Sequence, residues 1–513
     1  MAREGHAPQC SKQDFADGYH RRRPEHSALY KVIQAYWPEF AERAEEIGGL
    51  PDFVKKEFEA FLDCGVLERG FVAVKCPDCG FERLVGFSCK TRSFCPSCVG
   101  RRMNDTAVHL VDRVLPEVPI RQWICSMPFS IRYIMGYDKK LCADILSAFA
   151  SELMHFYKTR GKQALGLRSI NQAHSGAVTI LQRFDSALRL NPHAHTLALD
   201  GVYVRDESSG VLGFHPLPVP THQEVEQLAS CIAAKCEKVM RKHGRWVDED
   251  HADSEPDQLS LEHPALATCY QASVSGVEIL SERAGRPCLR LLTDPPAITT
   301  VKDPGAMAMV RGFSVHGITD VDGRDRGRLE KLCRYIARPP IAQKRLHLLD
   351  DGRIRYDFKH VWKDGTKAIV LSPLDFIARL CALVPPPYFH LTRFHALLAP
   401  NSALRAEVVP KPDAQAKQPE QLQLFDVNDP NAEKTEPSSK PNSRGRLPWA
   451  WLLKRVFKID ITVCPRCQGS LRIIELVTDS ATIAKRLAEA GLAPMPPPKP
   501  PPPIKGQLAL KFD

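Results

Sequence analysis

Two short cysteine pairs constrain the fold of this chain more than any other feature. Cys76 and Cys79 form the sequence "CPDC", and Cys95 and Cys98 form "CPSC" after fifteen intervening residues. This is the spacing of a zinc ribbon, in which two CxxC turns present four thiolates to one metal ion. The sequence therefore predicts a structural zinc site with Cys76, Cys79, Cys95 and Cys98 as ligands. Buried thiols without a metal are the alternative.

The other cysteines leave the exact ligand set open. The chain has 17 cysteines, and no apolar segment follows the charges of its N-terminal "MAREGHAPQC". We therefore expect reduced thiols rather than disulfides, a cytoplasmic location and no membrane partner. Cys89, or the more distant Cys64, could join the zinc site or stand apart from it. A third pair, Cys464 and Cys467, has no further ligand nearby in sequence, so half a zinc knuckle and an unmetallated turn stay equally open.

The charge of the chain favours a polyanionic partner. Lysine and arginine outnumber aspartate and glutamate by 70 to 60, which gives a formal net charge of +10. Lys90, Arg92, Arg101 and Arg102 cluster around the second cysteine pair, and we expect them to contact DNA phosphates. A closed four-thiolate site has no free coordination position, so chemistry is expected elsewhere in the chain.

Composition and periodicity divide the chain into six segments. Helical spacing dominates its beginning, and short strand-like runs alternate with helical stretches after residue 115, which is typical of an α+β fold. A later stretch is rich in proline, serine and charge, as linkers are. The predicted segments are an N-terminal helical region (1–60), a zinc-binding domain (61–115), an α+β domain (116–408), a disordered linker (409–446), a small CxxC module (447–492) and a proline-rich tail (493–513).

A histidine pair lies in the α+β segment. His193 and His195 belong to the strand-like run "RLNPHAHTLALDG". Residues two apart on a strand point to the same face, so the two imidazoles would lie side by side as a platform for a metal ion. A lone pair of histidines more often has a surface or hydrogen-bonded role, so a second feature is needed to decide.

That second feature is a tyrosine on a predicted helix. In "RDRGRLEKLCRYIARPP", residues 324–340, apolar residues follow helical spacing and two prolines end the helix. Tyr335 falls beside the apolar stripe, on the side of Arg328, Lys331 and Arg338. Such cations favour attack by a phenol on a phosphodiester, although a partly exposed tyrosine among solvated charges is the alternative. Together, the histidines, the tyrosine and the cations provide the residue types for metal-assisted transesterification of DNA.

Several stretches, taken in order, resemble the rolling-circle transposases of the insertion-sequence-ninety-one family. They are "FSCKTRSFCPSCVGRRM", "RQWICSMPFSIRY", "TILQRFDSALRLNPHAHTLALDGVYV", "RLEKLCRYIARPP", "FHLTRFHALLAPNSALR" and "WLLKRVFKIDITVCPRCQGSLRII". The resemblance implies that residues 116–408 form an α+β catalytic domain of the HUH type (His, hydrophobic, His). In such a domain an antiparallel sheet has flanking helices, with the histidines on a central strand and the tyrosine on a helix.

The resemblance also implies roles for individual residues. His193 and His195 would hold Mg²⁺ or Mn²⁺, with Gln182 of the preceding strand as the candidate third ligand. Tyr335 would attack single-stranded DNA at the end of a mobile element, leaving a 5′-phosphotyrosine and a free 3′-hydroxyl. Because the phosphotyrosine conserves the energy of the phosphodiester bond, rejoining would need no ATP.

One departure from the family bears on the mechanism. Founding members carry two tyrosines a helical turn apart, but Pro339 stands four residues after Tyr335, so the chain resembles the single-tyrosine branch. We interpret Tyr133 and Tyr137, which precede the histidines, as structural. A single nucleophile must be reused or be supplemented by a second subunit, so a homodimer is one expectation. The resemblance also implies action at the bacterial nucleoid.

Two other functions stay open on the residues alone. A zinc-dependent DNA-binding regulator would bind DNA without cutting it. A hydrolytic nuclease would use His193 and His195 to activate water and would form no bond to DNA. The family resemblance argues against both. Basic and aromatic residues in "KHVWKDG" (359–365) and "HLTRFHALL" (390–398) are candidates for binding the strand, with packing and solvated charge as the alternative.

Overall fold

The computed structural model describes residues 22–245, 257–295, 305–411, 449–457 and 460–492, which form two compact units. The larger unit contains 28–59, 90–245, 257–295 and 305–411, and the smaller contains 22–27, 60–89, 449–457 and 460–492. Most of the predicted linker (409–446) and the whole predicted tail (493–513) lie outside the described residues. Among the helices of these residues, none has an apolar stretch of the length that a lipid bilayer requires.

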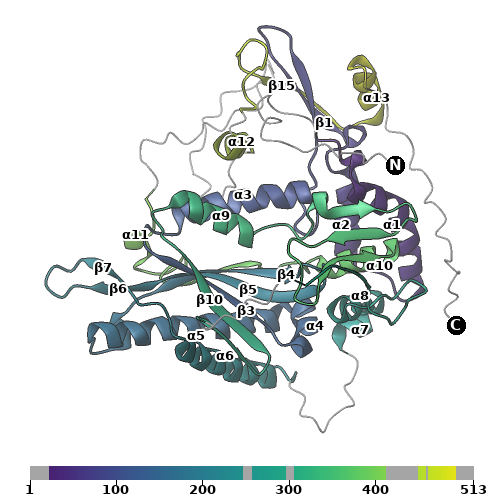
Figure 1. Ribbon diagram of the computed structural model, residues 1–513. Helices are drawn as coiled ribbons and strands as arrows, with labels where there is room; N and C mark the ends of the chain where they lie inside the picture. Colours follow the sequence, from purple (N-terminus) through teal and green to yellow (C-terminus); the bar gives the residue numbers. More distant parts are fainter. Residues whose placement is uncertain (1–21, 246–256, 296–304, 412–448, 458–459, 493–513) are drawn as a thin grey trace. The chain divides into compact units, whose positions relative to one another are not determined.

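A six-stranded antiparallel sheet forms the centre of the larger unit (Figure 1). Its strands are β14 (Thr392–Ala396), β4 (Gly176–Phe184), β5 (Leu190–Leu199), β3 (Ile120–Ser126), β10 (Phe313–Val321) and β9 (Met307–Val310), in that spatial order. Strand β5 is therefore an interior strand with β4 and β3 as its neighbours. Every residue of β4 is buried, because helices cover both faces of the sheet. This architecture confirms the predicted α+β fold with an antiparallel sheet and flanking helices.

The helices on the two faces of this sheet form two separate hydrophobic cores (Figure 1). Those on one face are α4 (Phe129–Tyr137), α5 (Lys139–Leu165) and α6 (His222–Lys242), and those on the other are α3 (Pro96–Arg113) and α9 (Arg326–Ile336). Ala194 and Ala198 of β5 belong to the first core, and Leu197 and Leu199 belong to the second. This division follows from the two-residue period of a strand, which sends successive side chains to opposite faces.

Helix α9 is fixed at its start and on its inner face. The carboxylate of Asp325 accepts the backbone N–H of Arg328 at 2.9 Å, which satisfies a donor that lacks a partner in the first helical turn. The helix ends three residues before Pro339, as the paired prolines predict. Its buried residues, which face the sheet, are Leu329, Cys333 and Ile336.

A four-stranded antiparallel sheet and a two-stranded hairpin complete the strands of the larger unit. The sheet has the order β11 (Leu346–Leu348), β12 (Ile354–Asp357), β13 (Thr366–Leu371) and β8 (Leu289–Leu292), and the hairpin joins β6 (Gly201–Arg205) to β7 (Leu212–Pro216). The remaining α-helices are α1 (Ala28–Glu46), α2 (Asp52–Asp63), α7 (Gln258–Glu262), α8 (Pro264–Ser275), α10 (Pro373–Leu383) and α11 (Arg405–Val408). Helix α10 is buried along its whole length and contacts both α1 and α8.

Strands from distant parts of the chain form the sheet of the smaller unit. β1 (Phe71–Lys75) pairs antiparallel with β2 (Glu82–Gly86) on one side and with β15 (Arg472–Val477) on the other. The helices of this unit include α12 (Trp449–Phe457) and α13 (Ser480–Glu489). Its buried core comprises Leu67, Phe71, Val477, Ile483 and Leu487. The segment predicted as a C-terminal module thus provides the third strand of a sheet that begins near residue 71.

Candidate active site

The two histidines lie side by side on an interior strand of the main sheet. In the register between β4 and β5, Gln182 is opposite His193 and Ile180 is opposite His195. The centres of the two imidazole rings are 4.9 Å apart. His193 and His195 alternate with Ala194, so they point to the face of the sheet that α3 and α9 cover.

Burial keeps both imidazoles neutral. Loss of hydration lowers the pKa of His193, and the same cause, aided by His193 and Arg338, lowers the pKa of His195 to about 3. The Nδ1 atom of His193 lies 2.8 Å from the carbonyl oxygen of Asn191, so this nitrogen carries the proton and donates it. A neutral ring held in this way offers the lone pair of Nε2, which is the form that binds a metal ion.

A buried glutamine orients the second histidine. The side-chain nitrogen Nε2 of Gln122, on β3, lies 2.9 Å from Nδ1 of His195. Both side chains are buried, with 5% and 4% of their surface exposed. A hydrogen bond at one imidazole nitrogen fixes the plane of the ring and decides which nitrogen remains available to a ligand.

Gln182 presents a buried oxygen without a protein partner. Its Nε2 donates to the carbonyl oxygen of Ile336 at 2.7 Å and approaches that of Tyr335 at 3.4 Å, both in α9. Its Oε1 forms no hydrogen bond with the described residues, although the side chain is only 3% exposed. Buried polar atoms are normally satisfied, so this oxygen, opposite His193, suits a metal ligand. Together with the two neutral imidazoles, it makes a donor set that fits Mg²⁺ or Mn²⁺.

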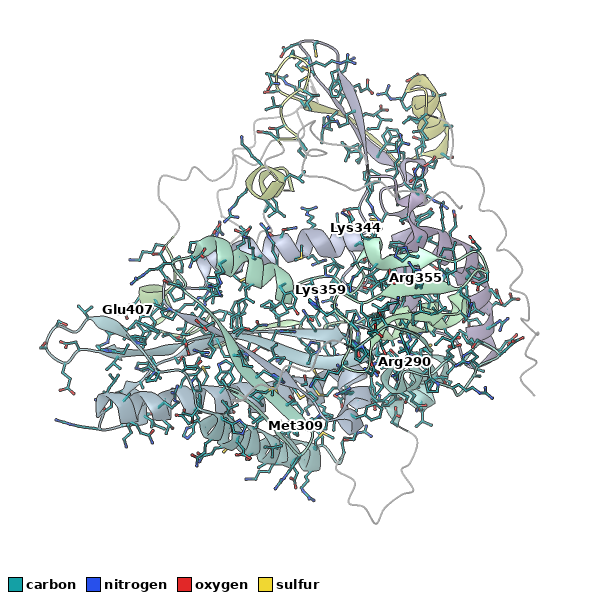
Figure 2. The ribbon with its side chains drawn as sticks, in the orientation of Figure 1. Arg290, Met309, Lys344, Arg355, Lys359 and Glu407 are labelled. Carbon is teal, nitrogen blue, oxygen red and sulfur yellow. The ribbon has the colours of Figure 1, made fainter. Side chains whose placement is uncertain are left out.

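Tyr335 extends from the last turn of α9 toward the histidines. Its ring is perpendicular to the ring of His195, with centres 6.3 Å apart, and 41% of its surface is exposed. The guanidinium of Arg338 lies 4.7 Å from the centre of the tyrosine ring, and Nζ of Lys359 lies 5.5 Å from it. Figure 2 shows Lys359 near this end of α9. The tyrosine ring therefore has two cations beside it.

The cations differ in part from those that periodicity indicates. Of the three predicted residues, Arg338 contacts the tyrosine ring, whereas Arg328 and Lys331 are exposed about two turns and one turn earlier in α9. The second cation, Lys359, follows β12, and helical spacing around Tyr335 carries no signal for it. Its only sequence signal is its place in the stretch "KHVWKDG", a candidate for strand binding.

A small cavity adjoins the exposed tyrosine. It has a volume of about 200 Å³, and its lining includes Tyr335, Arg338, Arg345, Lys359 and Trp362. Arg338 and Lys359 lie over the ring of Tyr335, and Arg345 lies over the ring of Tyr356. Among the described residues, none of these three side chains forms an ion pair, and the one carboxylate in the lining, that of Asp185, pairs with Arg189 at 2.7 Å. The cavity is therefore suited to an anion.

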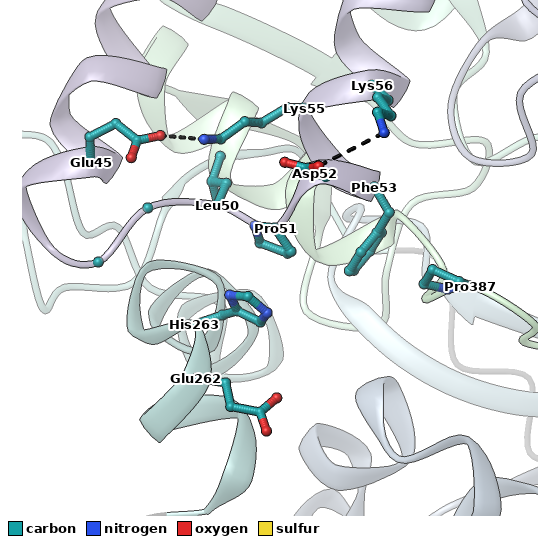
Figure 3. A pocket seen from close by; sticks show the side chains of 12 residues that line it. Glu45, Leu50, Pro51, Asp52, Phe53, Lys55, Lys56, Glu262, His263 and Pro387 are labelled. Atoms are coloured by element: carbon teal, nitrogen blue, oxygen red, sulfur yellow. Dashed lines mark hydrogen bonds and ion pairs between the residues drawn. The ribbon is translucent and has the colours of Figure 1, made fainter.

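A wider cavity of about 680 Å³ lies at the turn between α1 and α2 (Figure 3). Its lysines are already in ion pairs: Lys56 lies 3.8 Å from Asp52, and Lys55 pairs with Glu45. It contains neither of the histidines on β5 nor Tyr335. Of the two cavities, the smaller one is therefore the one that Tyr335 lines.

Two of the four predicted phosphate contacts near the second cysteine pair have contacts within the larger unit. The guanidinium of Arg92 donates to the carbonyl oxygen of Phe389 at 3.4 Å. The guanidinium of Arg102 donates to the carbonyl oxygen of Lys90 at 2.7 Å and to that of Thr91 at 3.2 Å. These bonds hold the loop before α3. Lys90 is exposed, and Arg101 is half-buried.

The cysteines group differently from the prediction. In the smaller unit, the thiols of Cys76 and Cys79 lie with those of Cys464 and Cys467, all within 4.8 Å of one another. This grouping differs from the predicted set, in which Cys95 and Cys98 accompany Cys76 and Cys79. Cys464 and Cys467, which have no other candidate ligands nearby in sequence, therefore lie beside Cys76 and Cys79 in the folded unit.

The backbone explains why two identical sequence patterns differ. Cys95 is the N-cap of α3, with Pro96 at the first helical position and Cys98 in the first turn. This pair therefore begins a helix, whereas Cys76 and Cys79 form the turn that follows β1. Cys64 and Cys89 lie together in the smaller unit, where the N–H of Cys89 donates to Sγ of Cys64 at 3.4 Å.

Two family models match this chain. Residues 32–127 match the transposase zinc-binding domain of the insertion-sequence-ninety-one family, Zn_Tnp_IS91. Residues 176–405, which include both histidines and Tyr335, match the transposase family Y2_Tnp. No curated protein and no solved structure gives a significant match. The two matches follow one another along the chain in agreement with the resemblance of the motifs, and together they support a transposase of the insertion-sequence-ninety-one family.

Proposed function

We propose that this transposase nicks and rejoins single-stranded DNA at the ends of a mobile element through a covalent bond to Tyr335. The observation that carries the proposal is the position of the exposed tyrosine ring, perpendicular to the ring of His195 at 6.3 Å. A nucleophile beside a pair of neutral imidazoles is the arrangement that metal-assisted phosphoryl transfer requires.

His193, His195 and Oε1 of Gln182 would hold the divalent ion, Mg²⁺ or Mn²⁺. When bound, the ion supplies Lewis-acid stabilisation of the charge on the attacked phosphate. The protein keeps the ligands in place: the carbonyl oxygen of Asn191 holds His193, the amide of Gln122 holds His195, and the carbonyl oxygen of Ile336 holds Gln182. All three residues belong to adjacent strands, and Gln182 lies opposite His193 in the register.

The covalent step exchanges one phosphate ester for another. The phenol oxygen of Tyr335 bonds to phosphorus and gives up its proton to water, while the bond from phosphorus to the 3′ oxygen breaks. That oxygen takes a proton and becomes the free 3′-hydroxyl. Attack by a 3′-hydroxyl on the phosphotyrosine reverses the exchange and rejoins DNA without another energy source. Arg338 and Lys359, beside the tyrosine, would neutralise the phosphate charge.

The cations of the cavity indicate where the strand would lie. Arg345 and Lys359 line the same cavity as Tyr335, so a phosphate next to the attacked one would meet them there. Arg328 and Lys331 are exposed on α9 and would extend this basic path. Lys90, Arg92, Arg101 and Arg102 remain proposed DNA contacts, and the guanidinium groups of Arg92 and Arg102 also donate to backbone carbonyl oxygens.

Tyr335 would act as the single nucleophile. Tyr133 and Tyr137 contact each other at 5.3 Å between ring centres and pack against the core on the opposite face of the sheet. Burial raises the pKa of both phenols, which opposes their use as nucleophiles. A complete reaction therefore reuses Tyr335 or takes a second copy of it from another subunit.

Incubation with Mn²⁺ and a labelled single-stranded oligonucleotide that carries the element's end tests the proposal. We expect a protein-sized labelled band after denaturing electrophoresis. Tyr335→Phe and His193→Ala should abolish it. Tyr388→Phe is the matched control, because Tyr388 is 80% exposed and also has a cation over its ring, Lys139 at 5.7 Å, but lies outside the cavity.

Other results would identify the competing functions. Cleavage that leaves free 5′-phosphate ends and unlabelled protein would identify a hydrolytic nuclease. Binding of the oligonucleotide without cleavage, unchanged in Tyr335→Phe, would identify a DNA-binding regulator.

A further inference from the structure

We propose that one zinc ion joins two distant parts of the chain in the smaller unit, with Cys76, Cys79, Cys464 and Cys467 as its four ligands. The matched zinc-binding domain ends at residue 127 and contains only the first two of these. The proposal rests on the geometry of the smaller unit and does not depend on the chemistry of Tyr335.

The two cysteine turns have the same backbone structure. In each, the N–H of the residue after the second cysteine, Gly80 or Gln468, donates to the carbonyl oxygen of the first cysteine at 3.0 Å. Both residues have left-handed backbone angles, with φ of 72° and 62°. The N–H of the first cysteine donates to the carbonyl oxygen five residues later, at 2.8 Å in one turn and 2.7 Å in the other. A matched pair of CxxC turns is how a zinc ribbon presents its ligands.

The two turns face each other at the right distance for one metal ion. Sγ of Cys76 lies 3.4 Å from Sγ of Cys467, and Sγ of Cys79 lies 3.5 Å from Sγ of Cys464. Thiolates bound tetrahedrally at about 2.3 Å from zinc lie about 3.8 Å from one another. A disulfide needs about 2.0 Å between the sulfur atoms. The four thiols therefore fit one zinc ion rather than two disulfides.

Side-chain contacts hold the two turns together around the thiols. Phe81, just after the first turn, packs against the buried residues Cys76, Cys464 and Leu471. The guanidinium of Arg466, inside the second turn, lies 5.3 Å from the centre of the Phe81 ring. The pairing of β1 with β15 brings the same two segments together. The ligands are thus preorganised by contacts that do not involve the metal.

Zinc analysis of the purified full-length protein tests the proposal without DNA. We expect the double variant Cys464→Ser/Cys467→Ser to contain one zinc ion fewer per chain than the wild type. The matched control is Cys231→Ser, which alters an exposed cysteine outside this set and should leave the zinc content unchanged. After replacement by Co²⁺, the thiolate-to-cobalt absorption of the double variant should be lower than that of the wild type by the contribution of one ion.

A conservative variant separates loss of a ligand from loss of folding. Cys467→His should keep this zinc ion, because imidazole also binds zinc and Cys467 lies at the exposed side of the site. A double variant that keeps the full wild-type zinc content would overturn the proposal. So would a wild-type protein whose zinc disappears in Cys95→Ser/Cys98→Ser and not in Cys464→Ser/Cys467→Ser. Because the assay contains no oligonucleotide, either outcome is independent of the adduct experiment.

Discussion

Replacing Gln122 is the sharpest test of how the histidine pair would bind metal. For Nε2 of His195 to offer a lone pair, its Nδ1 must carry the proton. The side-chain oxygen of Gln122 must then face Nδ1. Rotating the amide by half a turn exchanges its oxygen with its nitrogen, Nε2, which lies 2.9 Å from Nδ1 in the structure. Gln122→Leu removes that acceptor while keeping a side chain of similar size in a buried position.

The expected effect of this change is a weaker metal site, not a lost one. Removing a hydrogen-bond partner of a metal-binding histidine typically weakens metal affinity by about 10- to 100-fold. That range corresponds to about 1.4 to 2.8 kcal/mol of binding free energy. Gln122→Glu should restore or strengthen binding, because a carboxylate accepts the same hydrogen bond from Nδ1–H more strongly.

The assay is the Mn²⁺ concentration at which formation of the DNA adduct reaches half its maximum. Gln122→Leu should raise this concentration about 10- to 100-fold, and saturating Mn²⁺ should restore the adduct. An unchanged Mn²⁺ requirement would refute the assignment of Gln122 as the residue that orients His195. Equal weakening in Gln122→Leu and Gln122→Glu would contradict the acceptance of the Nδ1 proton of His195 by the side chain at position 122.

The remaining predictions concern stability. Asp200→Asn leaves the guanidinium of Arg121 buried without its carboxylate partner, which lies 2.6 Å away, so urea unfolding should show a loss of about 3–5 kcal/mol. Glu407→Gln, in the half-exposed pair with Arg205, should cost less than about 1 kcal/mol; equal losses would contradict the burial argument. Burial lowers the pKa of His395 to about 4, so the unfolded chain binds a proton that the folded chain excludes, and stability should fall as pH drops from about 6.5 to 4. In His395→Gln, the loss of unfolding free energy over this pH range should be smaller by up to about 3 kcal/mol. An unchanged pH profile of unfolding would refute the assignment.

The features that local sequence predicts well are those that depend on one element. The two-residue period of a strand predicts that His193 and His195 share a face, and the structure has them on one face of β5. The spacing of apolar residues and the paired prolines likewise predict the extent of α9 and the position of Tyr335 beside its buried stripe. In both cases, the relevant distances span only a few residues along the chain.

The features that sequence does not predict depend on contacts between elements. Lys359 and Gln122 reach the site from other segments, and no periodicity around Tyr335 or His195 indicates them. The zinc ligands are the clearest case, since three pairs share the pattern C-P-x-C. Which two pairs face each other depends on the pairing of β1 with β15 and on the helix that begins at Cys95.

The pairing of β1 with the last strand of the sheet also sets an order of events during synthesis. Cys76 and its partner Cys467 are 391 residues apart, so a ribosome adding about 5–20 residues per second needs roughly 20 to 80 s to pass from one to the other. Throughout that interval the edge of β1 that pairs with β15 has no partner strand. An unpaired strand edge is a template for pairing with other chains. A nascent transposase is therefore exposed to misassembly until β15 has been synthesised. A message that ends before β15 would yield a chain in which β1 pairs only with β2.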